Sequence, residues 1–128
     1  ISSLTHGYHE ARGDQFAAIM EFEEGGIGQY HANWYSPGGW RVVLYGDGVT
    51  VEFKPLEQGR WTDRNFIEHE IKPDDIDNVF KPGFYAQMKS FARLVVHGKL
   101  EWPALDLKGS YQTMLLAEKM SLDIVKNA

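Results

Sequence analysis

Apolar and polar residues alternate in short segments along the first half of the chain, a pattern typical of β-strands. In residues 14–23 every second position is apolar, so this predicted strand has one apolar face and one mixed face. The apolar positions are Phe16, Ala18, Met20 and Phe22. Residues 23–26 end in two glycines and predict a hairpin turn, because glycine accepts the positive φ that tight turns require. The alternation returns over residues 27–35, and the two segments together predict an antiparallel pair.

The same pattern predicts further strands on both sides of this pair. They cover residues 1–8, where the signal is weak, and residues 40–46, 49–54 and 66–72. The predicted connections cover residues 9–13, 36–39, 46–48, 55–65 and 73–78. Of these, residues 55–65 leave room for a short edge strand, and residues 73–78 are acidic and turn-like.

Helical spacing replaces the alternation from Pro82 onward. Pro82 suits the first turn of a helix, and Gly98 suits its C-terminal cap. The apolar stripe of this predicted helix is formed by Phe84, Met88, Phe91 and Val95. A second helix is expected to begin at Asp106, a favourable N-cap residue. Its predicted buried stripe consists of Tyr111, Met114, Leu115, Leu122 and Val125.

Strands followed by helices predict an α+β fold, and 128 residues suffice for a single domain, residues 1–128. We expect an open, mostly antiparallel sheet of about six strands with two helices packed on one face. The helices are expected to cover Phe16, Met20, Phe22, Tyr30 and Trp34. The opposite, open face would then display Ala17, Ile19, Ile27, His31, Asn33 and Tyr35. Such a half-apolar surface is larger than monomers commonly expose, and we expect a second copy of the chain to cover it.

Composition excludes several classes of protein. A formal net charge of −5, with Lys and Arg scattered, argues against a nucleic-acid partner or an anionic membrane surface. The absence of cysteine excludes disulfides and thiolate chemistry, and it fits a reducing compartment, so we expect a cytoplasmic protein. No apolar run approaches the roughly 18 residues of a membrane span.

The sequence contains several groups of potential metal ligands, but local structure explains each group better than a metal site does. His6 and His9 lie near Glu10, but a strand would point the two imidazoles to opposite faces, so a polar loop is favoured over a metal site. His69 fits the alternation of an edge strand. The acidic residues 74–77 lack the glycine and the closing glutamate of a calcium loop. We therefore predict no metal site.

Catalytic and phosphate-binding motifs are also incomplete. The glycines of residues 25–28 lie between two predicted strands, whereas a dinucleotide fingerprint opens a helix. No nucleophile elbow, P-loop or credible acid/base pair is present, so we predict no catalytic residue in this chain and no cofactor bound by it.

An aromatic cluster remains as a candidate binding surface. Trp34, Tyr35 and Trp40 flank the turn at residues 36–39, and such rings can stack on a sugar or a planar cofactor. His31 and Asn33 would offer hydrogen bonds beside them. Core packing is the favoured alternative for Trp34, whereas packing and binding stay equally open for Tyr35 and Trp40.

The order of these motifs resembles the C-terminal domain of the Gfo/Idh/MocA family (glucose–fructose oxidoreductase and inositol dehydrogenase). That family shows an Asp, a strand ending in F-x-[NE]-G, then G-x-x-x-x-S-W and an I-x-G-x-x-G turn. The matching positions here are Asp14, Phe22, Gly25, Gly28, Trp34, Gly46 and Gly48. The family's F-x-x-E-x-x-x-F corresponds to Phe84, Gln87 and Phe91, with Gln in place of Glu, and its P-x-x-D to Pro103 and Asp106. The resemblance covers nearly the whole chain.

Three features of the resembling enzymes are not found in this sequence. They are the G-x-G-x-x-G of a preceding Rossmann domain, the catalytic Lys of the E-K-P motif and a D-x-x-x-H pair. The resemblance therefore implies a piece of a longer NAD(P)-dependent dehydrogenase, inactive by itself, whose full-length form uses NAD or NADP. The alternative is a stand-alone, non-catalytic α+β ligand-binding or interaction module.

The resemblance also implies roles for individual residues. The loop after the second strand of the hairpin and the start of the first long helix would face a sugar, cyclitol or similar polyol. The implied substrate-binding residues are Asn33, Tyr35, Trp40 and Tyr85. The open sheet face would form a homo-oligomer, with Ala17, Ile19, Ile27 and His31 at the interface.

Overall fold

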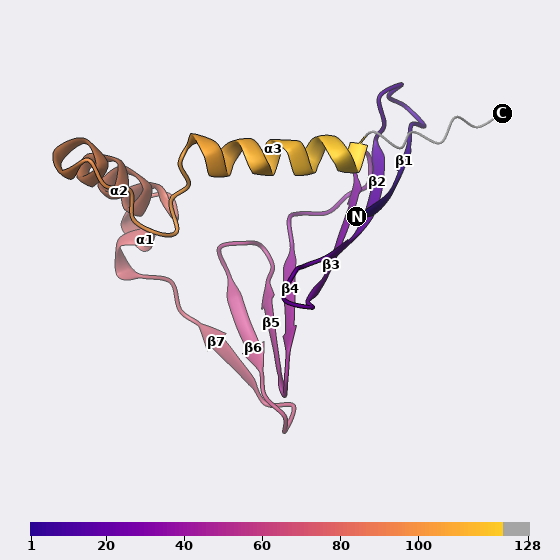
Figure 1. Ribbon diagram of the computed structural model, residues 1–128. Coiled ribbons are helices and arrows are strands. Elements are labelled where there is room, and N and C mark those ends of the chain that lie inside the picture. The colour runs from indigo at the N-terminus through magenta and orange to yellow at the C-terminus, as the bar shows by residue number, and fades with distance from the viewer. Residues whose placement is uncertain (122–128) are drawn as a thin grey trace. The chain divides into compact units, whose positions relative to one another are not determined.

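The computed structural model describes residues 1–121 and divides the chain into two compact units. The first unit holds Ile1–Pro37 and the helix that follows Leu105, and the second holds Gly38–Ala104. Figure 1 labels their helices and strands. Leu122 and Val125, which were expected to extend the apolar stripe of the last helix, lie outside the described residues.

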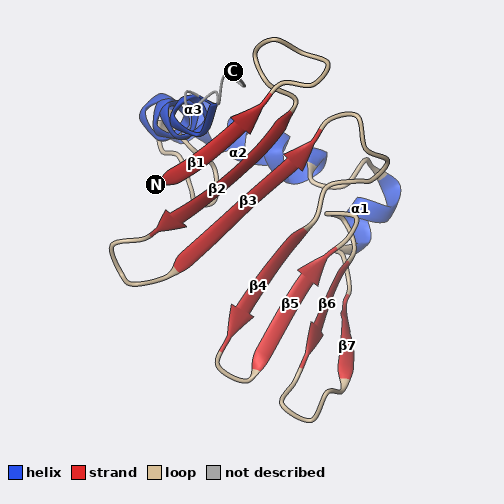
Figure 2. Ribbon diagram, turned by 90° about the vertical axis from the view of Figure 1, so that its right-hand side faces the viewer, coloured by secondary structure: helices blue, strands red, loops and turns tan. Residues whose placement is uncertain are grey.

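The first unit is built on an antiparallel sheet with strand order β1-β2-β3 (Figure 2). Its strands are β1 (Ser2–His6), β2 (Gln15–Glu21) and β3 (Ile27–Asn33). The register places Ala17 opposite Leu4 on one side and opposite His31 on the other. Gly25 adopts a φ of 88° in the turn between β2 and β3, which confirms the predicted hairpin.

One helix, α3 (Leu107–Ser121), packs on β1 and β2 of this sheet. Asp106 caps it as expected, since its Oδ1 accepts a hydrogen bond of 2.7 Å from the Gly109 N–H. Thr5, which is fully buried, ties the far end of the helix to the sheet through a 3.0 Å hydrogen bond from its Oγ1 to the Met120 carbonyl. Ala18 is buried on the same face of the sheet as Thr5 and belongs to this small core.

The second unit contains a separate antiparallel sheet with strand order β4-β5-β6-β7 and two helices. The strands are β4 (Val42–Gly46), β5 (Val49–Phe53), β6 (Gly59–Thr62) and β7 (Glu68–Ile71). The helices are α1 (Asp75–Val79) and α2 (Phe84–His97). Gly98 ends α2 with a φ of 65° and donates its N–H to the Leu94 carbonyl, as its predicted capping role requires.

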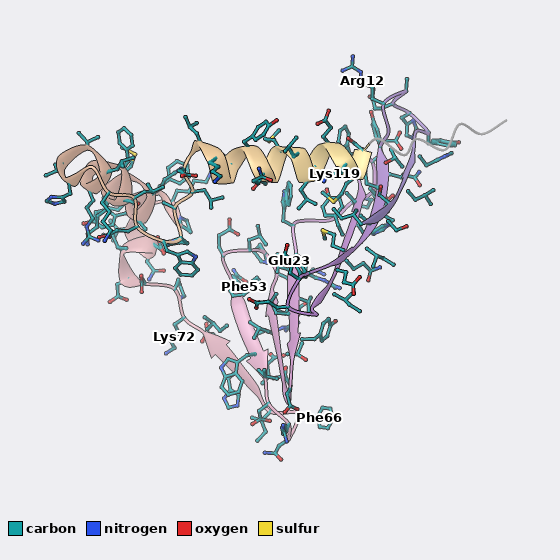
Figure 3. All side chains as sticks on the ribbon, viewed as in Figure 1. Arg12, Glu23, Phe53, Phe66, Lys72 and Lys119 are labelled. Atoms are coloured by element: carbon teal, nitrogen blue, oxygen red, sulfur yellow. The ribbon has the colours of Figure 1, made fainter. Side chains whose placement is uncertain are left out.

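The two faces of the β4–β7 sheet carry different kinds of side chain, because side chains alternate between the faces along every strand. One face is mostly apolar, with His69 stacked on Trp61. Its apolar side chains are Val42, Leu44, Val51, Phe53, Trp61 and Ile71. The other face carries mainly charged and hydroxyl side chains, together with Val43. At the turn between β6 and β7, Phe66 adopts a positive φ of 61° and leaves its ring almost wholly exposed (Figure 3).

The α+β class with open antiparallel sheets is confirmed, but the expectation of one sheet of about six strands is wrong. In the described part of the chain, seven strands form two sheets, because β3 and β4 do not pair. The connection between them contains Pro37, Gly38 and Gly39, and both residue types disfavour a continuing strand.

The expectation of two helices on one sheet face also needs correction. Among the helices of residues 1–121, only α3 contacts a sheet, whereas α2 contacts α1. The Gly83 N–H donates to the Asp77 carboxylate over 2.9 Å at the start of α2, and this bond ties the two helices together. Phe22 and Trp34, expected under the helices, are more than half exposed. Residues 75–78, predicted as part of a turn, form most of α1 instead, since acidic residues in a first turn favour a helix.

Within the described residues, none of the helices combines the length and the apolar character that crossing a membrane requires.

Candidate functional site

A buried carboxylate, Asp14, organises the loop between β1 and β2. Its side chain is 1% exposed and accepts hydrogen bonds from three successive backbone N–H groups of the loop. The bonds from Tyr8 and Glu10 measure 3.1 and 2.9 Å, and the third comes from His9. The loop is thereby held in one conformation against the end of the sheet.

The main chain of Asp14 joins the same loop to both neighbouring strands. Its N–H donates to the His6 carbonyl, and its carbonyl accepts from the Trp34 N–H, each over 3.0 Å. Gly13, just before it, has a φ of 103°, and a Cβ there would lie 2.4 Å from Thr5 Cγ2. Glycine is therefore required at this position by conformation and by space.

The protonation of Asp14 reflects its surroundings. Burial alone raises its pKa, but the hydrogen bonds from His9, Glu10 and Tyr8 favour the charged form and outweigh burial, so the pKa lies below its ordinary value. The backbone N–H groups that donate these bonds thus take the place of the water molecules that would otherwise solvate the carboxylate.

The ordered loop presents His9 and Glu10 to Tyr35, which follows the end of β3. The Tyr35 hydroxyl donates a 2.6 Å hydrogen bond to Glu10 Oε1, and the His9 ring lies 4.4 Å from the Tyr35 ring between centroids. The bond to Glu10 raises the pKa of Tyr35, because the phenol must keep its proton to donate. We call His9, Glu10 and Tyr35 the loop cluster.

The loop cluster combines groups that recognise hydroxyl-bearing ligands. Glu10 keeps a second carboxylate oxygen as an acceptor, and Tyr35 and His9 offer ring surface and further polar atoms. All three side chains are exposed and accessible from solvent. The cluster is suited to binding and orienting a ligand.

The predicted substrate-binding residues fall in both units. Asn33 and Tyr35 belong to the first unit, where the Asn33 amide lies 3.2 Å from His31 Nε2. Trp40 and Tyr85 belong to the second unit. Trp40 is exposed before β4, and the Tyr85 ring stacks on Phe80 at 5.9 Å between centroids. Trp34 packs at 5.4 Å on Phe16 yet remains more than half exposed.

The predicted oligomer residues share the sheet face opposite Ala18, in the register of β1–β3. Ile19 is 59% exposed and Ile27 is 80% exposed, while Ala17 is half-buried and His31 exposed. Leu4, which was not predicted, adds a further exposed apolar side chain to this face. Their role at an interface stays a prediction.

Sequence reasoning missed the combination of Glu10, His9 and Asp14. Residues 9–13 were predicted only as a polar connection, and this part is confirmed. The available signal was Gly13 followed by Asp14 at the start of a strand, a pair that suits a left-handed turn with a carboxylate cap. Among residues 1–121, no group of three or more His, Cys, Asp or Glu side chains could hold a metal ion.

Comparison with known proteins found no match to the chain among family models, curated proteins or solved structures. The family resemblance therefore rests on the motifs of the sequence.

We expect Asp14→Asn to lower the urea midpoint of unfolding at neutral pH, because the amide presents an N–H group to donors that need an acceptor. The folded pKa of Asp14 is depressed, so its stabilisation is present above the unfolded pKa of about 4 and is lost as the pH falls through the folded value. The variant should therefore lose less stability than the parent on acidification. Urea unfolding followed by tryptophan fluorescence at several pH values measures both effects.

Asp47→Asn is the matched control, since the Asp47 side chain is 96% exposed and makes a surface ion pair with Arg64. It should leave the midpoint nearly unchanged. An Asp14→Asn midpoint equal to that of the parent at neutral pH would contradict the structural role of Asp14.

Proposed function

We propose that this chain is the C-terminal substrate-binding and dimerisation domain of an NAD(P)-dependent oxidoreductase that acts on a sugar, cyclitol or similar polyol. The loop cluster is the observation that carries the proposal. It joins Tyr35, which the resemblance assigns to the substrate, to a carboxylate and an imidazole suited to hydroxyl groups. A cytoplasmic location is part of the proposal.

Cofactor binding is assigned to another domain of the same enzyme. In the described residues, the glycines of residues 25–28 join two strands of a hairpin, so their N–H groups do not form a phosphate site at the start of a helix. This glycine turn therefore does not fit the pyrophosphate of a nicotinamide dinucleotide. The chain would contribute substrate contacts and assembly, and we expect it to be inactive by itself.

In this proposal, the loop cluster orients the substrate. The Glu10 carboxylate would accept hydrogen bonds from ligand hydroxyls, while its bond to Tyr35 fixes the direction of the carboxylate. Asp14 acts one step further away, because it holds the backbone on which His9 and Glu10 are carried. A substrate positioned in this way would lose less freedom at the reacting step.

Dimerisation is assigned to the open face of the β1–β3 sheet. This face carries Leu4, Ile19 and Ile27, each more than half exposed, and α3 occupies the opposite face. Apolar side chains gathered in this way favour burial against a partner. A second copy of the chain is the partner that the family resemblance implies.

We expect Ile19→Lys to convert a dimer at high micromolar concentration into a monomer, because it places a charge in the middle of the apolar face. Light scattering or sedimentation velocity gives the mass directly. Val79→Lys, on an exposed position of α1, is the control and should leave the dimer intact. A parent chain that is monomeric at this concentration, or an Ile19→Lys variant that stays dimeric, would contradict the assignment.

In the intact enzyme, we expect Tyr35→Ala and Trp40→Ala to raise KM or lower kcat for the polyol by about tenfold, with the fold preserved. The reason is the loss of ring surface and, for Tyr35, of the bond that directs Glu10. Trp102→Ala serves as the control, because the Trp102 side chain is 92% exposed and outside the assigned site. Variants that lose stability and keep normal kinetics would show that the two aromatics are packing residues.

A further inference from the structure

The polar face of the β4–β7 sheet forms a second candidate site, in the second unit. A hollow of about 260 Å³ lies on this face and is lined by side chains from all four strands. Its position follows from the register, since Tyr45, Thr50 and Thr62 stand opposite one another across β4, β5 and β6. Val43 adds apolar surface to the lining.

The charged side chains that line the hollow carry no net charge, because two arginines face two glutamates. Glu52 lies between two guanidinium groups: Arg60 Nε donates to its Oε2 over 2.9 Å, and Arg41 lies 3.8 Å from its Oε1. Arg60 also lies 3.4 Å from the Glu68 carboxylate. The hydrogen bond from Arg60 keeps the pKa of Glu52 below its ordinary value, so the carboxylate remains charged at neutral pH. A charged ligand would therefore meet no net opposite charge.

Hydrogen-bonding capacity remains open in the same place. Within residues 1–121, the hydroxyl groups of Tyr45, Thr50 and Thr62 make no hydrogen bond to another group of the chain, although all three line the hollow. Each hydroxyl can both donate and accept. In the same part of the chain, the ion pair of Arg41 is a long one, to Glu52, so the guanidinium keeps N–H donors available.

We propose that this hollow binds a neutral, polyhydroxylated small molecule such as a cyclitol or a monosaccharide. Balanced charge disfavours ions, whereas adjacent donors and acceptors match ligand hydroxyls, which have both properties. The volume accommodates a single six-membered ring. The site belongs to the β4–β7 sheet and does not depend on the loop cluster or on the proposed oxidoreductase function.

The test is a titration of the isotopically labelled 128-residue chain with myo-inositol, followed by amide chemical shifts. We expect saturable shifts at Thr50, Glu52 and Thr62 with a Kd of about 1 mM, the range usual for a ligand of this size. Sodium acetate and glycine betaine, as charged and zwitterionic probes, should give no saturable shift at these amides. Saturation by either probe without saturation by myo-inositol would overturn the proposal.

The double variant Thr50→Val/Thr62→Val removes two hydroxyl groups but keeps the branched shape that suits a strand. It should weaken binding by about tenfold or more. Tyr45→Phe is a second variant that removes only one oxygen from a side chain that is 80% exposed, and it should weaken binding about threefold without affecting folding. Thr113→Val, the same chemical change on α3, should have no effect.

Unchanged affinity in both hollow variants, or no saturation by myo-inositol of the folded parent, would overturn the proposal. Shifts confined to Glu10 and Tyr35 would overturn it as well and would support the loop cluster instead. Saturation at the hollow with no response at the loop cluster would support the hollow while counting against the proposed substrate contacts. The two assignments can therefore fail separately.

Discussion

A carboxylate can be buried only where hydrogen bonds replace the water that it loses, and in the first unit Asp14 obtains these bonds from the loop that it organises. The same hydrogen bonds hold His9 and Glu10 in place, because the backbone N–H groups of these two residues donate to the Asp14 carboxylate. Gly13 and Thr5 complete the arrangement, one by its conformation and one by filling the adjacent space. The contact between Glu10 and Tyr35 is a consequence of loop order.

Side chains alternate between the two faces along the strands of both units, but the resulting faces differ between the units. In the β1–β3 sheet it separates a face covered by α3 from a face with exposed Ile19 and Ile27. In the β4–β7 sheet it separates an apolar face from a ladder of charges centred on Glu52. The open face of the β1–β3 sheet and the hollow on the β4–β7 sheet therefore lie on the uncovered or polar face of their sheet, and the opposite face of each sheet is mainly apolar.

Local features of the sequence predicted local structure well. The alternation and glycines around Gly25 predicted the β2–β3 hairpin, and Asp106 and Gly98 predicted two helix caps. Which strands pair, and which sheet a helix covers, depend on contacts between distant residues that periodicity does not encode. The loop cluster was missed for a related reason, since the role of Asp14 depends on the path of the backbone before it.

Amide hydrogen exchange tests most directly the claim that Asp14 orders the loop that carries the candidate site. The N–H groups of Tyr8, His9 and Glu10 lie in a surface loop, yet each is bonded to the buried carboxylate. We predict that they exchange much more slowly than the N–H of Glu24, in the exposed turn between β2 and β3. Exchange at the same rate as Glu24, after correction for intrinsic rates, would contradict the account.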